Sequence, residues 1–400
     1  MEKDQIEQFI RCYRDNLLDE VLPFWMEHGV DQDLGGIITS LDRSGTVIDD
    51  DKGVWQQGRF TWLLGELYNH RLLQDHPQRQ SWLETAERNL SFMSRFAFDT
   101  EDGRMWFHLT REGKPIRKRR YAFSESFAAI AYGEWAQATG SEEYAQQAEA
   151  CFEAFVTQST SEPDHPKFTD NRPSKGIGFS MIAIVTAQQL RDSIQLETAD
   201  AWIDRCIAEI QRDFCKPDLE CVMENVGLQG EVLEHFDGRT LNPGHAMEAA
   251  WFIMSEGVHR QDTALQDLGC QMLDWMWQRG WDKEHGGLLY FTSLDGKPIQ
   301  EYWQDMKFWW PHNEAIIATL MAWKITGDEK YATWHRQIHE WSHDHFQDVE
   351  YGEWFGYLRR DGQVVTPLKG NLWKGPFHLP RMQLIAWDLL ETLPSERVMH

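Results

Sequence analysis

An internal repeat of about 65 residues constrains the fold of this chain more than any other feature. Five segments share one pattern, in which an apolar stretch, a polar turn with Gly and a second apolar stretch follow one another; they cover residues 35–45, 104–113, 221–230, 286–296 and 353–362. Their turn glycines stand at 45, 113, 230, 296 and 362, so the gaps are 68, 117, 66 and 66 residues. The long gap is nearly two periods, and the Pro- and Asp-rich stretch 161–176 fills the missing place.

The segments between these turns have helical periodicity. The apolar residues at 60, 63, 64 and 67 follow the i, i+3, i+4, i+7 spacing of a helix with one buried face. A second sequence similarity supports the repeat, because the sequence TGSEEYA at 139–145 recurs as TGDEKYA at 326–332. In both places Thr-Gly ends one helix and the acidic residues open the next.

Six units of two helices each predict about twelve helices. An open stack would expose two terminal units, whereas closing the stack into a ring removes them. We therefore expect an all-α fold, an (α/α)6 barrel or six-hairpin toroid with short β-hairpins between helix pairs, formed as a single domain over residues 1–400. An open helical array is the alternative.

The six predicted helices that follow the hairpins begin with polar residues and then turn apolar. Equivalent places in them hold Arg59, Glu125, Met181, His245, Glu314 and His378, at steps of 66, 56, 64, 69 and 64 residues. Equivalent positions in a closed ring lie at the same height, so these side chains should converge at one mouth of the barrel. A lone His on an apolar helix usually belongs to the core, but ionisable residues at five of these six places predict a shared site.

This set of residues suits proton transfer. Two His on different parts of a ring can flank one substrate: one removes a hydrogen from a carbon next to a carbonyl, and the other returns a proton from the opposite face, which inverts the carbon. Arg59 could stabilise the enolate oxygen that develops. Glu248, three residues after His245, shares its helix face and could orient the imidazole or hold a sugar hydroxyl. The positive ends of helix N-termini favour neutral imidazole, the form that a general base needs.

Composition narrows the possible partners. The net charge of −25 leaves no basic stripe to meet phosphates, which argues against nucleic acid. The isolated basic run Arg117–Arg120 is either a solvated turn or a local anchor for an anionic or polar ligand. The 20 Trp residues exceed what core packing needs, and flat apolar rings that line a sugar site would use the surplus. A small molecule is the expected ligand.

The sequence also indicates a compartment. The six cysteines, at 12, 151, 206, 215, 221 and 270, form no CxxC pair and no zinc spacing, and most read as small buried residues. The N-terminal residues lack the features of a signal peptide, and no apolar run approaches the ~18 residues of a membrane span. We expect a cytoplasmic protein with no membrane contact.

Sequence motifs for a cofactor are missing. There is no GxGxxG after a strand, no HExxH and no nucleophile elbow. The stretch Gly370–Gly375 has a phosphate-loop-like spacing of glycines but lacks the Lys and Ser/Thr that should follow it, so it matches a nucleotide loop only weakly. We expect no catalytic metal and no required cofactor.

Four stretches, in the right order, make the chain resemble the N-acylglucosamine 2-epimerase family over nearly its whole length: 242–252 (NPGHAMEAAWF), 307–315 (KFWWPHNEA), 353–358 (EWFGYL) and 374–381 (KGPFHLPR). The resemblance implies a six-fold α/α barrel, usually a homodimer without catalytic metal, that interconverts N-acetylglucosamine and N-acetylmannosamine through an enolate. Some members respond to ATP as an effector.

The resemblance also implies roles for individual residues. It places the two catalytic histidines on His245 and His378 and a substrate-binding arginine on Arg59. The further candidates for substrate binding are Tyr121, Glu125, Met181, Glu248, Trp310, Glu314 and Arg381.

Two departures from related patterns refine this expectation. Cellobiose epimerases and aldose–ketose isomerases carry a third histidine on the helix where this chain has Met181. Ketose formation needs a group that moves a proton between the C1 and C2 oxygens, which Met cannot do, and its soft apolar side chain would suit an acetyl methyl. The N-acyl branch is therefore favoured. Asn371 and Trp373 stand where the N-acyl enzymes usually have Gly and Phe, a departure that bears on the response to ATP.

Three other functions compete with this one. The first is an epimerase or aldose–ketose isomerase of an unmodified sugar such as mannose or cellobiose. The second is an (α/α)6 glycoside hydrolase, which would draw two carboxylates from Glu125, Glu248 and Glu314 but would leave both histidines unexplained. The third is a barrel that binds a protein partner and has a degenerate site.

Overall fold

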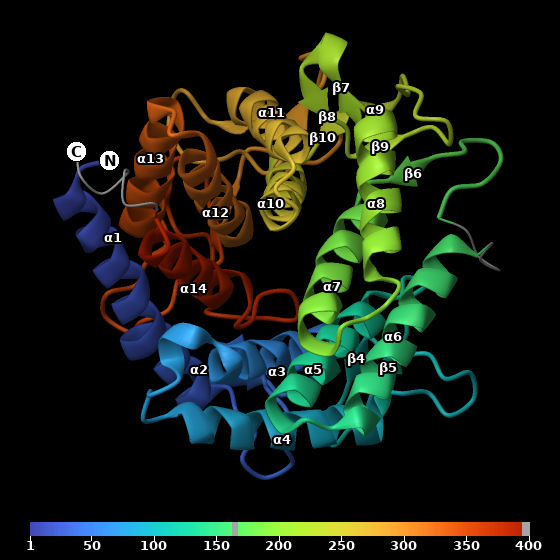
Figure 1. Cartoon of the computed structure of the whole chain (residues 1–400), viewed down its shortest axis with the longest axis vertical. Coiled ribbons are helices and arrows are strands. Elements are labelled where there is room, and N and C mark those ends of the chain that lie inside the picture. Colours follow the sequence, from blue (N-terminus) through green and yellow to red (C-terminus); the bar gives the residue numbers. More distant parts are fainter. Residues whose placement is uncertain (162–166, 394–400) are drawn as a thin grey trace.

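Six inner helices stand around a central axis in the computed structural model, which describes residues 1–161 and 167–393 (Figure 1). Each contains one of the six repeat-equivalent positions named above. The inner helices are α3 (Val54–Asn69), α5 (Phe123–Thr139), α7 (Gly178–Ile194), α10 (Pro243–His259), α12 (Trp309–Thr326) and α14 (His378–Glu391). Neighbours along the chain pack on one another, α3 on α5, α5 on α7, α10 on α12 and α12 on α14.

A second layer of helices surrounds the first and runs between its members in the chain. It consists of α4 (Arg79–Phe96), α6 (Glu142–Thr160), α8 (Ala199–Glu209), α11 (Thr263–Gly280), α13 (Glu329–Phe346) and, at the start of the chain, α1 (Lys3–Asp15), which continues through a π-helical turn (Asn16–Val21) into α2 (Leu22–His28). The fold is an (α/α)6 barrel, as the repeat predicts. Shorter helical segments are Arg71–Leu73, Ile210–Phe214, Pro217–Leu219 and α9 (Phe236–Arg239).

The two layers differ in how they bury apolar residues. In α4 the buried positions Trp82, Ala86, Leu90 and Met93 form one stripe that faces inward, as expected for a helix with one side in water. In α12, by contrast, every residue from 309 to 323 is buried. The inner helices are covered by outer helices on one side and by each other on two sides, so only a narrow stripe is left to face the axis. Polar residues on that stripe must therefore serve the interior of the ring.

Short antiparallel strands join the units at the ends where the inner helices begin. The pairs are β1 (Ser40–Leu41) with β2 (Val47–Asp49), β6 (Lys175–Gly176) with β9 (Asn225–Val226), β7 (Cys215–Lys216) with β8 (Cys221–Val222), β10 (Thr240–Leu241) with β11 (Thr292–Ser293), β12 (Lys307–Phe308) with β13 (Tyr357–Leu358), and the three strands β3 (Lys52–Gly53), β4 (His108–Leu109) and β5 (Pro115–Arg117).

The predicted hairpins are present only in part. The segments around Gly45 and Gly113 form hairpins, and all five predicted turn glycines have positive φ, from 73° to 89°. The strands at 221–226, 292–293 and 357–358, however, pair with strands outside their own segment. The pairings β6–β9, β10–β11 and β12–β13 connect neighbouring units, so these strands hold the ring together as well as turning the chain. Of the stretch 161–176, expected to fill the sixth place, residues 162–166 lie outside the described residues.

A buried ion-pair arrangement, here called the clamp, recurs in three units. An Asp in the turn after an outer helix meets a buried Lys from its own unit and an Arg from the next unit. Asp31 lies 2.9 Å from Lys52 and 2.8 Å from Arg111, and Asp282 lies 3.0 Å from Lys307 and 2.8 Å from Arg360.

The third clamp joins the last unit to the first. Asp348 lies 2.9 Å from Lys369 and 2.6 Å from Arg43. The two basic partners hold the pKa of the Asp348 carboxyl well below its usual range, against the opposing effect of burial. The clamp thus spans the seam at which the ring closes.

Among the helices of residues 1–161 and 167–393, none combines the length and the apolar character that a membrane span requires.

Candidate active site

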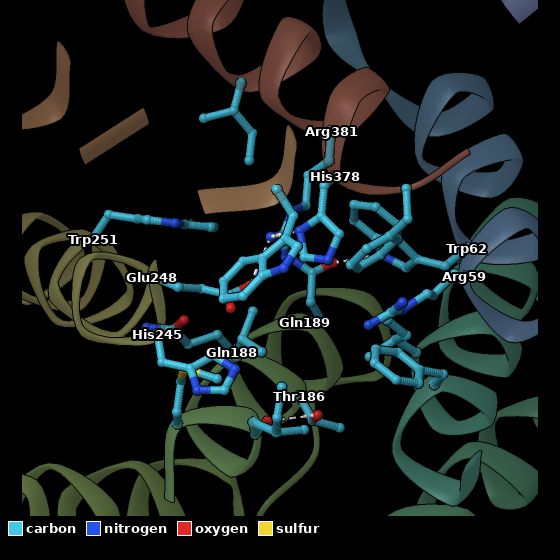
Figure 2. A pocket seen from close by; sticks show the side chains of 18 of the residues that line it. Arg59, Trp62, Thr186, Gln188, Gln189, His245, Glu248, Trp251, His378 and Arg381 are labelled. Atoms are coloured by element: carbon cyan, nitrogen blue, oxygen red, sulfur yellow. Dashed lines mark hydrogen bonds and ion pairs between the residues drawn. The ribbon is translucent and has the colours of Figure 1, made fainter. Parts of the chain in front are cut away.

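A cavity of about 1010 Å³ lies inside the ring and is lined by all six inner helices. Each helix contributes a stripe at helical spacing; α3, for example, presents Trp55, Arg59, Trp62 and Glu66. Figure 2 shows lining side chains pointing into the cavity from several sides, with Arg59 and Trp62 across from His245 and Glu248, and with His378 and Arg381 next to Glu248. Aromatic rings are prominent, as the composition predicts. The lining tryptophans are Trp55, Trp62, Trp251, Trp303, Trp309, Trp310 and Trp373.

His378, the first residue of α14, is held by a buried carboxylate. Its Nδ1 lies 2.7 Å from Glu314 Oε1, and Trp251 Nε1 donates to the other oxygen of the same carboxylate at 2.8 Å. If Nδ1 carries the proton that Glu314 accepts, Nε2 keeps its lone pair. Burial lowers the pKa of His378 well below its usual range, and the guanidinium groups of Arg381 and Arg59 act in the same direction. These influences favour the neutral imidazole of His378, the form that accepts a proton.

His245, the third residue of α10, is held by a different carboxylate. Its Nδ1 lies 3.0 Å from Glu224 Oε2, and Asn242, which caps the helix, contacts the same nitrogen at 3.0 Å. Burial by itself would lower the pKa of His245, but the charges of Glu224, Glu248 and Glu314 outweigh burial and raise it. The expectation of neutral imidazole at helix N-termini thus agrees with His378 and disagrees with His245.

Trp310 lies between the two histidines. Its ring centroid is 5.1 Å from that of His245 and 5.8 Å from that of His378, and both pairs are tilted rather than stacked. The side chain of His245 is 31% exposed and that of His378 is 11% exposed. The two imidazoles are therefore close enough to address one small ring from different directions.

Arg59 is a cation without a carboxylate partner among the described residues. Its guanidinium lies 4.2 Å from the Phe127 ring centroid and 4.7 Å from that of Phe377, and its Nε is buried without a hydrogen bond. Burial lowers the pKa of Arg59 to about 9, so the group stays charged at neutral pH. Aromatic faces stabilise the cation but leave its N–H donors unused. Such a group can stabilise negative charge that develops on a substrate oxygen.

Arg381 is the contrasting cation of the site. Its Nη2 donates to Glu314 Oε1 at 2.6 Å and to Glu248 Oε1 at 2.8 Å. Glu248, Glu314 and His378 bring their ligand atoms within 4.8 Å of one another, a geometry that could hold a metal ion. Arg381 already supplies the positive charge between the two carboxylates, so these residues do not fit a metal ion. Glu248 consequently pairs with Arg381, whereas the sequence suggested that it could orient His245.

The predicted site residues fall into three groups. One group lines the cavity and consists of Arg59, Met181, His245, Glu248, Trp310, His378 and Arg381. Glu314 does not line the cavity and contacts Nδ1 of His378. Tyr121 and Glu125 are not among the lining residues: the Tyr121 ring stacks on Phe123, and Glu125 accepts hydrogen bonds from the side chain of Arg104 and the backbone N–H of Met105. Glu125 therefore fastens the preceding hairpin to α5.

Sequence reasoning missed several residues of the site. Glu224 comes from the segment 221–230, which was read only as a turn. Its signal was a carboxylate in the hairpin directly before the helix of His245. Tyr290 and Trp303 line the cavity from the loop between α11 and α12, where no periodicity marks them.

The glycine-rich stretch 370–375 satisfies its own polar groups. Asn371 Oδ1 accepts from the backbone N–H groups of Trp373 at 2.8 Å and Lys374 at 2.9 Å, two amides that a phosphate would need. The basic run 117–120 approaches the same edge of the cavity. Lys118 pairs with Asp99 and Asp102, while the Arg119 guanidinium lies 5.1 Å from the ring centroid of Trp373.

Comparison with known proteins places this geometry in context. A family model described as N-acylglucosamine 2-epimerase matches residues 35–375. The N-acylglucosamine 2-epimerase of Bos taurus is 36% identical over 410 aligned residues, which cover 99% of this chain and 94% of that protein. The protein of the same name from Homo sapiens is 36% identical over 94% of this chain and 89% of its own length. Among solved structures, cellobiose 2-epimerase from Bacillus thermoamylovorans B4167 superposes with a TM-score of 0.82 at 19% identity, covering 96% of this chain and 99% of that one.

Proposed function

The chain belongs to the N-acylglucosamine 2-epimerase family, and from this we propose that it interconverts N-acetylglucosamine and N-acetylmannosamine by moving a proton at C2. One observation carries the proposal for the site: two histidines, each with a carboxylate on Nδ1, have pKa values displaced in opposite directions. A reaction that removes a proton on one face and returns one on the other needs such a pair, one imidazole neutral and the other protonated.

Under this proposal the reaction uses these side chains in sequence. The open-chain sugar presents its C1 aldehyde, which makes the hydrogen on C2 acidic. His378 Nε2 removes that proton, the electron pair moves to the C1 oxygen, and the resulting enolate is stabilised by Arg59. His245 then donates its proton to C2 from the opposite face. The reaction is reversible, so His245 acts as the base and His378 as the acid in the other direction.

The substrate is proposed from the side chain that α7, the neighbour of α10, presents to the cavity. Met181 is buried and lines the cavity on α7, where it offers an apolar surface to an acetyl methyl and no proton-transfer group. An enzyme of this kind inverts C2 without building up ketose. We therefore expect a much higher kcat/KM for N-acetylmannosamine than for mannose or cellobiose.

The reaction needs no cofactor under this proposal, because the bases, the acid and the enolate-stabilising cation all come from the chain. ATP, an effector in some relatives, would have to act without the two amides that Asn371 already occupies, so the assay is run with and without it. We further propose that the protein works in the cytoplasm as a homodimer, which light scattering of the purified protein tests.

The deciding experiment is proton NMR of N-acetylmannosamine incubated with the protein in D₂O. We expect N-acetylglucosamine to appear with deuterium at C2, because the histidine that donates to C2 carries a deuteron taken from the solvent. Epimerisation with full retention of the C2 proton would contradict the two-base enolate scheme. Better turnover of mannose, or fructose as the main product, would contradict the N-acyl assignment and leave the reaction class intact.

A further inference from the structure

A cluster of metal-ligand side chains lies outside the cavity, where α1 packs beside α13 at the seam of the ring (Figure 1). His339 and His343 are one helical turn apart on α13, so their rings stand on the same face, with centroids 4.0 Å apart. Cys12 of α1 faces them. Neither the reaction nor the cavity uses any of these three side chains.

The distances in this cluster suit a tetrahedral metal ion. The Cys12 sulfur and the two imidazoles offer ligand atoms that all lie within 4.8 Å of one another. Cys12 Sγ lies 3.5 Å from His343 Nε2. Zinc binds thiolate at about 2.3 Å and imidazole at about 2.0–2.1 Å, and tetrahedral angles then require a sulfur–nitrogen separation of about 3.5 Å. The observed sulfur–nitrogen separation for Cys12 and His343 matches this value.

The surrounding hydrogen bonds can leave the Nε2 lone pairs of both imidazoles free. His343 Nδ1 is 2.8 Å from the His339 carbonyl oxygen, to which it can only donate. For His339 the proton placement follows a chain of contacts. His335 Nδ1 lies 3.3 Å from the Ile316 carbonyl, and His335 Nε2 lies 3.2 Å from the Tyr13 hydroxyl.

That chain fixes the tautomer of His339. His335 donates from Nδ1 to the carbonyl, so its Nε2 accepts from the Tyr13 O–H. The Tyr13 oxygen then accepts from His339 Nδ1 at 2.8 Å, and His339 Nε2 is left as a lone pair. Histidines that bind metals in proteins characteristically donate their other ring N–H to a carbonyl or a comparable acceptor. Both imidazoles have this support.

We propose that Cys12, His339 and His343 bind one late first-row divalent cation, above all zinc, and thereby fasten α1 to α13. Thiolate and imidazole ligands select such a cation over calcium or magnesium. Binding replaces the Cys12 S–H bond by a metal–sulfur bond and releases the proton to solvent, with water completing four ligands. The ion does not take part in the reaction, and this inference does not rest on the proposed function.

The test uses cobalt as a spectroscopic substitute for zinc. The full-length protein is freed of metal with EDTA, dialysed and titrated with Co²⁺. We expect one equivalent to give the visible bands of tetrahedral cobalt and a thiolate-to-cobalt band in the near ultraviolet, both removed by Zn²⁺. The thiolate band locates the ion, because the other three-residue group in the described chain, Glu248, Glu314 and His378, contains no sulfur.

Stability gives a second readout. Zinc at about 100-fold above its Kd should raise Tm by about 3 °C for a chain of this length, since only the folded protein brings the ligands together. Cys12→Ser and His343→Gln should each abolish the thiolate band and the rise in Tm. His345→Gln, a matched change on the same helix whose ring is outside the cluster, should retain both. Epimerase turnover of the wild type should be equal with EDTA and with zinc.

Two results overturn the proposal. One is a wild-type protein that shows neither the thiolate band nor a rise in Tm, which would mean that Cys12 and His343 share only a hydrogen bond. The other is metal binding that survives unchanged in both Cys12→Ser and His343→Gln. If one variant fails to fold, the wild-type thiolate band and the other variant still decide the question.

Discussion

The surroundings of His245 and His378 contain the same types of residue but shift the pKa of the two imidazoles in opposite directions. His245 and His378 both begin an inner helix, both place Nδ1 against a glutamate and both contact Trp310. Yet the pKa of His245 is raised and that of His378 is lowered. The His–Glu pair therefore does not by itself decide whether an imidazole is charged.

The difference comes from the next layer of charges. Around His378 the guanidiniums of Arg381 and Arg59 add positive charge and disfavour the imidazolium. Around His245 the carboxylates of Glu224 and Glu248 add negative charge and favour the imidazolium. The site thus shifts two identical side chains in opposite directions, since cations dominate around His378 and carboxylates around His245. The predictions below test this asymmetry.

The largest effect is expected when either histidine is removed. His245→Asn and His378→Asn should each lower kcat by about 10²–10⁴-fold, because each takes away the acid or base for one face of C2. The informative measurement is proton exchange by NMR in D₂O. Each variant should still exchange C2 of one epimer without converting it, and the two variants should act on opposite epimers. Full activity in either variant would show that its histidine is structural.

A smaller loss is expected when the cation of the His378 side is removed. Arg59→Met should lower kcat by about 10²-fold, since the enolate loses its charge partner. It should also raise the pKa of His378, because a positive neighbour is gone. His378 must be neutral to act as the base, so activity is lost as pH falls through its pKa, and the acidic limb of the kcat/KM profile should move to higher pH. An unmoved acidic limb would show that Arg59 does not set the charge of His378.

A loss of about tenfold is expected when the carboxylate of the His245 side is neutralised by Glu224→Gln. The raised pKa of His245 keeps it protonated, and activity is lost as pH rises through that pKa. Removing the charge of Glu224 lowers the pKa, so the alkaline limb should move to lower pH while the acidic limb stays.

Glu231→Gln is the matched control for this change. Its carboxylate lies in the same hairpin and accepts from the backbone N–H of Gln229, away from the histidines. Its pH profile should equal that of the wild type. An unchanged alkaline limb in Glu224→Gln, or an equal shift in both variants, would contradict the role given to Glu224.

The smallest effect is expected at Tyr121. The residue was predicted to bind substrate, but its ring stacks on Phe123 and does not line the cavity. Tyr121→Phe keeps that stacking, so kcat/KM for N-acetylmannosamine should stay within about twofold of the wild type. A tenfold rise in KM would show that Tyr121 does contribute to substrate binding.

The repeat made the ring predictable but not the direction of every side chain. Glycine spacing and helical periodicity placed all six inner helices, and the site residues were sought at equivalent steps along the chain. Those steps do not fall at equivalent helix positions: Glu125 is the third residue of α5, whereas Arg59 is the sixth of α3. His245 is also the third residue of its helix and yet lines the cavity, so the position along the helix does not by itself decide where a side chain points. The contacts decide it: Glu125 accepts hydrogen bonds from Arg104 and Met105 of the preceding hairpin.

Other parts of the site lay beyond reach of the sequence for a different reason. Glu224 meets His245 only because β9 pairs with β6 across two units, and such contacts between distant segments leave no periodic trace. The pairing of Arg381 with Glu248 and Glu314 likewise joins three separate helices. The sequence indicates which residue types can transfer protons or carry charge, but only the folded ring shows which of them contact one another.

The clamp that joins Asp348 to Arg43 has a consequence for how the molecule comes apart. A linear array of helical repeats loses its end units first, because each end has only one neighbour. Here the seam is fastened by the same Asp–Lys–Arg arrangement as the interior junctions of Asp31 and Asp282, so no unit is left with a single neighbour. Fraying one unit must therefore break two junctions at once. All six units should therefore unfold in one cooperative step. A substitution that breaks any one clamp should lower the free energy of unfolding of the whole ring.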